Sequence, residues 1–192
     1  MNEDHLSYPD SKPSDFGLSR NSNESLPSVE GLNWPVECRI WVYLSNRRFE
    51  PGERVELESS LARFTANWTA HQMPLKAYSA VFMSQIIVIA VDERTQPVSG
   101  CSIDSVVRFL KECEERWNVC LLDGGRLARR DGAELVVESL SEARLQVQAG
   151  RIHARTHFLN VFARHFGEWQ RETWLTAGSG PYARMLGISN TN

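Results

Sequence analysis

The chain contains very little lysine. Among its 192 residues only Lys12, Lys76 and Lys111 are lysines, so arginine carries nearly all of the positive charge. Lysine is the usual residue of Schiff-base sites and of phosphate-binding loops, so very few positions are open to that chemistry. The formal net charge is −3, which predicts no broad basic field of the kind that captures nucleic acid strongly.

Paired cysteines and long apolar runs are absent too. The four cysteines, at positions 38, 101, 113 and 120, form no CxxC pair and no metal-ligand spacing. Free thiols of this kind are typical of a reducing compartment. The longest apolar run, residues 86–91, is too short to cross a bilayer. The first ten residues, MNEDHLSYPD, are too acidic and polar for a secretory signal. We therefore expect a cytoplasmic protein that does not bind membranes.

The common nucleotide and hydrolase motifs are missing. The sequence has no G-x-x-x-x-G-K-[ST] loop, which excludes an ATPase of the P-loop type. It also lacks G-x-G-x-x-G, G-x-S-x-G and H-E-x-x-H. We accordingly expect no cofactor and no metal.

The composition predicts a globular protein behind a polar tail. Hydrophobic residues make up 42% of the chain and charged residues 23%, which is ordinary for a folded domain. Residues 1–33 are rich in Ser, Asn, Asp, Glu and Pro and bury too little surface to offset their ordering entropy. We predict a disordered tail at 1–33 and a single α+β domain at 34–192. Within that domain, 34–124 form the core unit and 125–192 a C-terminal extension.

The pattern of the core unit predicts two helices and four strands. Leu57, Leu61, Phe64 and Trp68 recur at helical spacing, and β-branched runs such as QIIVIAVD indicate buried strands. The resulting order, β-α-β-β-α-β, is that of a ferredoxin-like split βαβ sheet with both helices on one face. The expected elements are a strand at 36–44, a helix at 51–70, a hairpin of 75–83 and 85–92 around Ser84, a helix at 102–117 and a strand at 119–123.

The C-terminal extension has weaker patterns. Residues 134–138 suit a strand, and Ser139 with Glu142 forms an S-x-x-E capping box for a helix at 140–149. A stripe of apolar residues favours a further helix at 151–170, although THFLNVF suits a strand equally well. The final GSGPYARMLG segment looks like a loop.

A catalytic cysteine is one interpretation of the segment SGCSID. Cys101 would lie at a helix N-terminus, where unpaired N–H groups and the helix dipole favour the thiolate. His71 would act as its base and Asp104 would orient that histidine. The simpler alternative makes the same residues a helix cap: Gly100 forms the turn, and Cys101 or Ser102 caps the helix.

Other clusters carry weaker hypotheses. His153 and His157 would share a face with His165 if they lay on one helix, but no third strong ligand is evident and surface histidines explain them. In GGRLARRDG, Arg126 and its neighbours would clamp an anion, or simply form a solvated loop. Trp68 and Ser102 join Arg126 as candidate ligand-binding residues, although core packing alone accounts for Trp68.

Three pieces of the chain carry a resemblance. WVYLSNR (41–47), FTANWTAH (64–71) and SGCSID (99–104) occur in this order and resemble a family of uncharacterised bacterial proteins common in Bacteroidota and their relatives. Members are often labelled "ABC transporter ATPase", which this chain, without a Walker A loop, does not fit. The resemblance implies the boundaries of the core unit and draws attention to Trp68, His71, Cys101 and Asp104. It implies no activity.

Three functions remain open at this point. The first is a non-enzymatic domain that binds a ligand or a protein partner, with Trp41 and Tyr43 or the opposite parity lining a free sheet face. The second is a small enzyme built on Cys101, His71 and Asp104. The third is a binder of single-stranded nucleic acid that uses strand aromatics and arginines.

Overall fold

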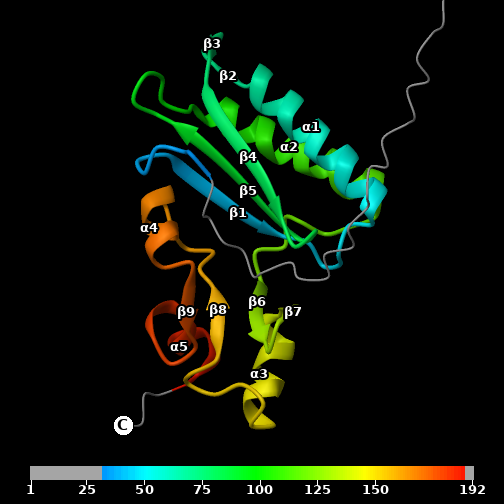
Figure 1. Ribbon diagram of the computed structural model, residues 1–192, viewed down its shortest axis with the longest axis vertical. Helices are drawn as coiled ribbons and strands as arrows, with labels where there is room; N and C mark the ends of the chain where they lie inside the picture. Colours follow the sequence, from blue (N-terminus) through cyan, green and yellow to red (C-terminus); the bar gives the residue numbers. More distant parts are fainter. Residues whose placement is uncertain (1–31, 189–192) are drawn as a thin grey trace, which may run out of the picture.

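Figure 1 shows a computed structural model of the protein, in which residues 32–188 are described. The predicted tail at 1–33 lies outside the described residues except for its last two positions. The elements in chain order are β1 (Arg39–Leu44), α1 (Pro51–Asn67), β2 (Thr69–Ala70), β3 (Met73–Pro74), β4 (Lys76–Phe82), β5 (Ile86–Asp92), α2 (Gly100–Trp117), β6 (Arg126–Asp131), β7 (Glu134–Ser139), α3 (Leu140–Gln148), β8 (His157–Leu159), α4 (Phe166–Arg171), β9 (Trp174–Thr176) and α5 (Gly180–Leu186).

The first sheet is antiparallel and has the strand order β1-β5-β4. Its central strand β5 is buried along its whole length, as its continuous apolar run predicts. Strands β4 and β5 form the predicted hairpin, and two of its three loop residues, Met83 and Ser84, have positive φ. Such a turn matches the natural twist of paired strands. This order leaves β1 and β4 at the two edges of the sheet.

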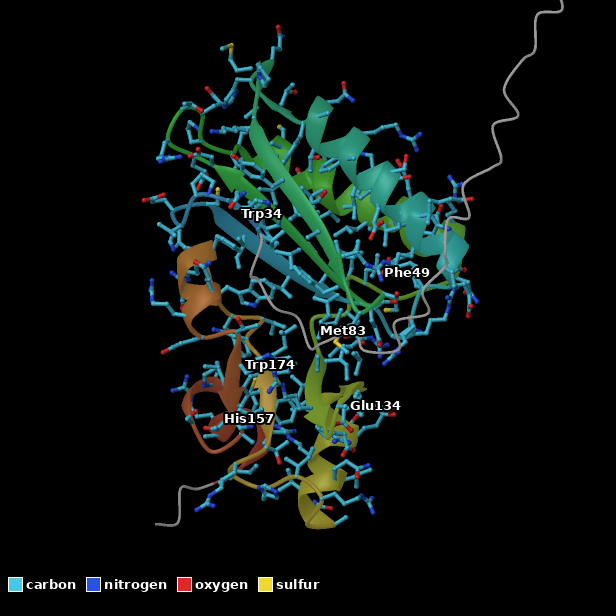
Figure 2. All side chains as sticks on the ribbon, in the orientation of Figure 1. Trp34, Phe49, Met83, Glu134, His157 and Trp174 are labelled. Carbon is cyan, nitrogen blue, oxygen red and sulfur yellow. The ribbon has the colours of Figure 1, made fainter. Side chains whose placement is uncertain are left out.

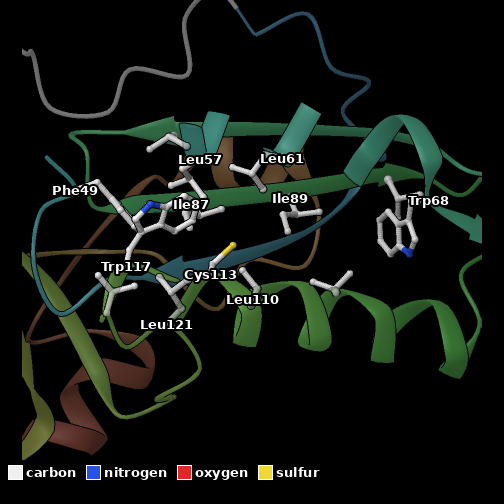
Figure 3. Close-up of a cluster of buried hydrophobic side chains, with 14 of the residues drawn as sticks. Phe49, Leu57, Leu61, Trp68, Ile87, Ile89, Leu110, Cys113, Trp117 and Leu121 are labelled. Atoms are coloured by element: carbon white, nitrogen blue, oxygen red, sulfur yellow. The ribbon is translucent and has the colours of Figure 1, made fainter. Parts of the chain in front are cut away.

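Helices α1 and α2 cover one face of this sheet (Figure 1), and the prediction of two helices on one face is confirmed. Residues four apart on α1, Leu57 and Leu61, meet Leu110 of α2 and Ile87 of β5 in one apolar cluster (Figure 3). Helix α1 is shorter than expected, because Trp68 adopts an extended conformation at its C-cap. The indole closes the far end of the cluster (Figure 3).

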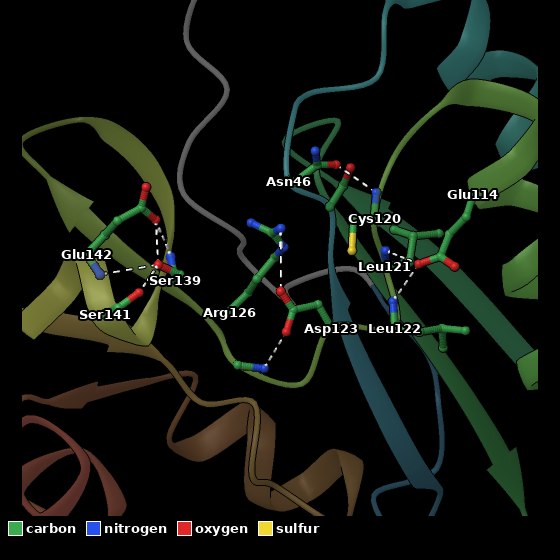
Figure 4. Close-up of polar contacts among 12 residues, drawn as sticks. Asn46, Glu114, Cys120, Leu121, Leu122, Asp123, Arg126, Ser139, Ser141 and Glu142 are labelled. Carbon is green, nitrogen blue, oxygen red and sulfur yellow. Dashed lines mark hydrogen bonds and ion pairs between the residues drawn. The ribbon is translucent and has the colours of Figure 1, made fainter.

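The predicted strand at 119–123 is wrong. That segment joins no sheet, because side chains and a single backbone hydrogen bond, from the Asn46 N–H to the Cys120 oxygen at 3.2 Å, hold its backbone (Figure 4). Glu114 accepts hydrogen bonds from the backbone N–H groups of Leu121 (2.6 Å) and Leu122 (2.9 Å), and Asn46 accepts one from Cys120 (2.7 Å). The first sheet therefore has three strands, and the ferredoxin-like split βαβ arrangement is not confirmed.

The C-terminal residues pack against the other face of the first sheet. A second apolar cluster contains Ile40 of β1 and Val88 of β5 together with Leu159, Phe166 and Trp169. Figure 2 places Met83, which belongs to the same cluster, at the junction of the upper sheet and the lower strands. Residues 125–188 thus share a core with the first sheet, and neither face of that sheet is free.

The second sheet has the strand order β7-β6-β8-β9. Its first hairpin contains the segment GGRLARRDG, so the prediction of a solvated loop there is wrong. Arg129 on β6 is nearly buried and pairs with Glu138 at 2.6 Å. An arginine that is buried with a carboxylate partner holds two strands together in a way that periodicity does not reveal.

The rest of the extension departs further from its sequence pattern. The capping box of Ser139 and Glu142 is present at the start of α3, as predicted. The helix expected at 151–170 is wrong, because residues 157–159 pair with β9 and only residues 166–171 are helical. The final segment is helix α5, whose buried Tyr182 donates a hydrogen bond to the backbone oxygen of Leu159 at 2.5 Å. No helix among residues 32–188 is long and apolar enough to cross a membrane.

Candidate functional site

A cleft of about 340 Å³ opens at the N-terminus of α2. It brings together four of the residues singled out in the sequence: Trp68, His71, Cys101 and Ser102. Asp104, the third residue of the catalytic hypothesis, is exposed and does not line the cleft. The structure therefore places the proposed nucleophile and base in one cleft and leaves the proposed orienter outside it.

The floor of the cleft is the capped end of α2. Ser99 is the N-cap, and its hydroxyl accepts a hydrogen bond from the Ser102 N–H at 3.2 Å. The Ser102 hydroxyl in turn accepts one from the Ser99 N–H at 2.7 Å, which completes a reciprocal capping box. The backbone N–H groups of Gly100 and Cys101 have no partner among residues 32–188. The cap interpretation is thus realised, with Ser99 and Ser102 rather than Cys101 as the capping residues.

The wall of the cleft is the β2–β3 hairpin. Its two turn residues, His71 and Gln72, both have positive φ, and His71 is exposed. Trp68 is buried, and its indole N–H donates to the backbone oxygen of Ser102 at 2.9 Å. This bond fixes the start of the hairpin against α2, which explains why His71 and Cys101 lie in the same cleft.

The cysteines differ strongly in accessibility. Cys101 is exposed, Cys120 is half-buried, and Cys38 and Cys113 are buried. Burial raises the pKa of Cys38 to about 11 and that of Cys113 to about 12. Only the thiolate is nucleophilic, so the two buried thiols are doubly protected.

We predict that iodoacetamide alkylates Cys101 first under native conditions at neutral pH, with Cys120 second and Cys38 and Cys113 last. Peptide mass spectrometry over time measures all four rates in one sample. In the enzyme hypothesis, His71→Gln slows the alkylation of Cys101, whereas in the cap interpretation its rate is unchanged. Cys38 or Cys113 reacting before Cys101 would contradict the packing described above.

Arg126 lies in a different place. It pairs with Asp123 at 3.5 Å at the start of β6 (Figure 4) and lines a hollow of about 260 Å³ with Leu44 and Phe162. A larger hollow of about 630 Å³ lies beside it, lined by consecutive β1 residues 39–43. The two hollows share Val42, Tyr43 and Val161.

Part of the edge of β1 is unpaired inside these hollows. The Ile40 N–H points away from β5 and donates to the Arg164 oxygen at 3.1 Å. Since backbone groups alternate along an antiparallel strand, the N–H and C=O groups of Val42 and Leu44 point to the same side. No backbone group within residues 32–188 pairs with them there.

Sequence reasoning missed this edge. The sequence shows which side chains of β1 share a face. Which edge of the strand stays unpaired depends instead on the strand order and on where residues 164–166 lie. Those residues pair with the start of β1 through the bridge between Arg39 and His165 and through the Phe166 N–H, which donates to the Cys38 oxygen at 2.8 Å. They leave the outward groups of Val42 and Leu44 open, as far as the Asn46 N–H, which donates to the Cys120 oxygen at 3.2 Å.

The histidines of the extension do not form a site. His153 lies in a turn, where its ring nitrogen Nδ1 accepts the backbone N–H of Arg155 at 3.3 Å, and His157 lies on β8 (Figure 2). Among residues 32–188 no three His, Cys, Asp or Glu side chains group as a metal site would require.

No family model, curated protein or solved structure matches this chain. The resemblance of its three sequence pieces to a bacterial family therefore stays a prediction. Two sites of the structure bear on function: the cleft at α2 and the unpaired edge of β1 at Val42 and Leu44.

Proposed function

We propose that the protein is a cytoplasmic, non-enzymatic protein-binding domain that takes up an extended peptide along the open edge of β1. The observation that carries the proposal is the pair of residues Val42 and Leu44, whose outward N–H and C=O groups have no partner among residues 32–188 and line hollows of about 630 and 260 Å³. Unpaired edge groups are the template for strand addition, in which backbone hydrogen bonds supply affinity and side-chain pockets supply specificity.

The surroundings of the edge support this function. Trp41 and Tyr43 are half-buried against the helices, while Val42 faces the second cluster. Both faces of the strand are therefore held rigid by packing, and only its edge is exposed in the hollows. A ligand strand would meet a preorganised row of hydrogen-bonding groups, which lowers the ordering cost of binding.

Val42→Pro tests the proposal. Proline removes the outward N–H of residue 42 but is tolerated at an edge strand, and Val42→Ala is the matched control that keeps the N–H while losing similar packing. Short random peptides that bind the full chain, selected on an array, should bind Val42→Pro about tenfold or more weakly, as expected for about 1.4 kcal/mol from one lost hydrogen bond. Val42→Ala should retain most of the affinity.

Amide hydrogen exchange gives a second, independent readout. Bound peptide should protect the amides of Val42 and Leu44 in the unsubstituted protein, which does not depend on the folding of any variant. Failure to select any binder, or selected peptides that protect other amides and ignore Val42→Pro, would overturn the proposal.

A second candidate function is the Cys/His enzyme, favoured by the presence of Cys101 and His71 in one cleft. It lacks its third residue, since Asp104 lies outside. The alkylation experiment above tests it. Binding of single-stranded nucleic acid has less support, because packing covers both faces of the first sheet and leaves no aromatic platform.

A further inference from the structure

We infer that the peptide bound at β1 is the carboxyl-terminal end of a partner protein, with its terminal carboxylate next to Arg164. This inference rests on the proposed strand addition and adds to it the direction of the ligand, the point at which it ends and the group that meets it. Three observations carry it: the direction of residues 164–166, the block that they form and the unpaired charge of Arg164.

The direction follows from the residues that already pair with β1. Residues 164–166 run antiparallel to it, as the bridge between Arg39 and His165 shows. A ligand that continues this row in the same direction enters beside Cys120, whose oxygen already accepts the Asn46 N–H at 3.2 Å, and passes Leu44 first and Val42 second. Its carboxyl end then points at Arg164.

The point at which the ligand strand ends follows from the pairing of Arg164 with Ile40. The oxygen of Arg164 already occupies the Ile40 N–H at 3.1 Å, so no ligand residue can pair with that group. A strand entering the row must stop or turn away after Val42. A chain terminus needs no turn at this end of the row.

The charge at this point suits a carboxylate. The Arg164 side chain is exposed and has no carboxylate partner among residues 32–188. The other arginines of the two hollows are already paired: Arg39 lies 3.9 Å from Glu93, and Arg126 lies 3.5 Å from Asp123. Arginine forms charge-assisted, bidentate hydrogen bonds with carboxylates, so Arg164 is the free cation at the end of the row.

A second copy of the chain fits the edge less well than a single strand. The open part of β1 lies in hollows walled by Val161 and Phe162. Within the described part of the chain, only Val42 and Leu44 have outward backbone groups without a partner on this edge. If a second copy paired through its own β1 edge, its residues Val161 and Phe162 would collide with Val161 and Phe162 of the first copy. We therefore commit to a single peptide strand as the occupant.

The test compares short peptides of the same sequences made with a free carboxyl terminus and as carboxamides, probed with the full chain. We expect the free acids to bind about tenfold or more tightly than the amides. Arg164→Gln should abolish that preference. Arg155→Gln, a change at an exposed arginine that lines neither hollow, should leave it intact.

The outcomes separate this inference from the proposed function. Amides that bind as tightly as acids, yet still lose affinity with Val42→Pro, would overturn the carboxylate and leave strand addition standing. Affinity that ignores both Val42→Pro and amidation would overturn both. A concentration-dependent dimer in sedimentation that dissociates with Val42→Pro would replace the peptide by a second copy and overturn the inference.

Discussion

Glu138→Ala is expected to destabilise the protein by about 3–5 kcal/mol, because it leaves the guanidinium of Arg129 buried without its main partner. The Arg129 and Glu138 side chains are only 10% and 8% exposed, and they meet at 2.6 Å between β6 and β7. For a buried ion pair, removing one partner lowers the free energy of unfolding by more than the intact pair contributes to it, because the remaining charge is left buried and unpaired. Chemical denaturation followed by far-UV circular dichroism measures the change.

Two controls isolate the buried charge in that experiment. Arg129 also meets Asp131 at 3.0 Å, but Asp131 is 65% exposed, so Asp131→Asn should cost less than about 1 kcal/mol. Replacing both partners, Arg129→Met with Glu138→Leu, should restore most of the lost stability, since an apolar pair of similar size is often neutral. A single variant Glu138→Ala as stable as the parent would show that water reaches Arg129.

Trp169→Ala is expected to cost about 3–5 kcal/mol through the cavity that it leaves. The Trp169 side chain is fully buried in the cluster that joins the extension to the first sheet and lies 5.8 Å from the Phe82 ring of β4. Because both parts contribute to one cluster, they should lose stability together. Urea unfolding followed by tryptophan fluorescence and by circular dichroism should give coincident transitions in the parent protein.

The control for Trp169→Ala is Phe162→Ala in the same segment. Phe162 is 42% exposed, so its truncation should change the unfolding free energy by less than about 1.5 kcal/mol. Two separated transitions in the parent, with only the second moved by Trp169→Ala, would mean that residues 125–188 fold independently of the first sheet. That result would contradict a shared core.

The proposed ligand site depends on the same shared core. Residues 161–166 form one wall of the two hollows beside β1 and close the row at Ile40, and Phe166 anchors them in the cluster around Trp169. Gly167 makes the close approach possible, because a side chain there would come within 2.9 Å of the Val36 side chain. Loss of the junction would therefore remove the binding edge together with the stability.

Of the candidate cleft at α2, the sequence predicted the helix start to within two residues, but not Ser99 as its N-cap. Ser99, Gly100 and Cys101 form a local start signal for a helix, and a capping box acts within four residues. Cys101 and His71 line the same cleft because the hydrogen bond from Trp68 to Ser102 fixes the hairpin against the helix. The sequence did not show that Asp104 lies outside the cleft, because this depends on how α2 is oriented relative to the β2–β3 hairpin.

The sequence by itself determined the α+β class, the two amphipathic helices, the β4–β5 hairpin and the cap of α3, because each rests on periodicity or on turn chemistry within a few residues. The tertiary structure decided the rest. Residues 119–123 form no strand because the distant Asn46 and the nearby Glu114 carboxylate take their N–H groups, and β8 is a strand because β6 and β9 offer it partners. The open edge of β1 exists for the same reason: pairing is settled between segments far apart in the chain, and no local pattern records it.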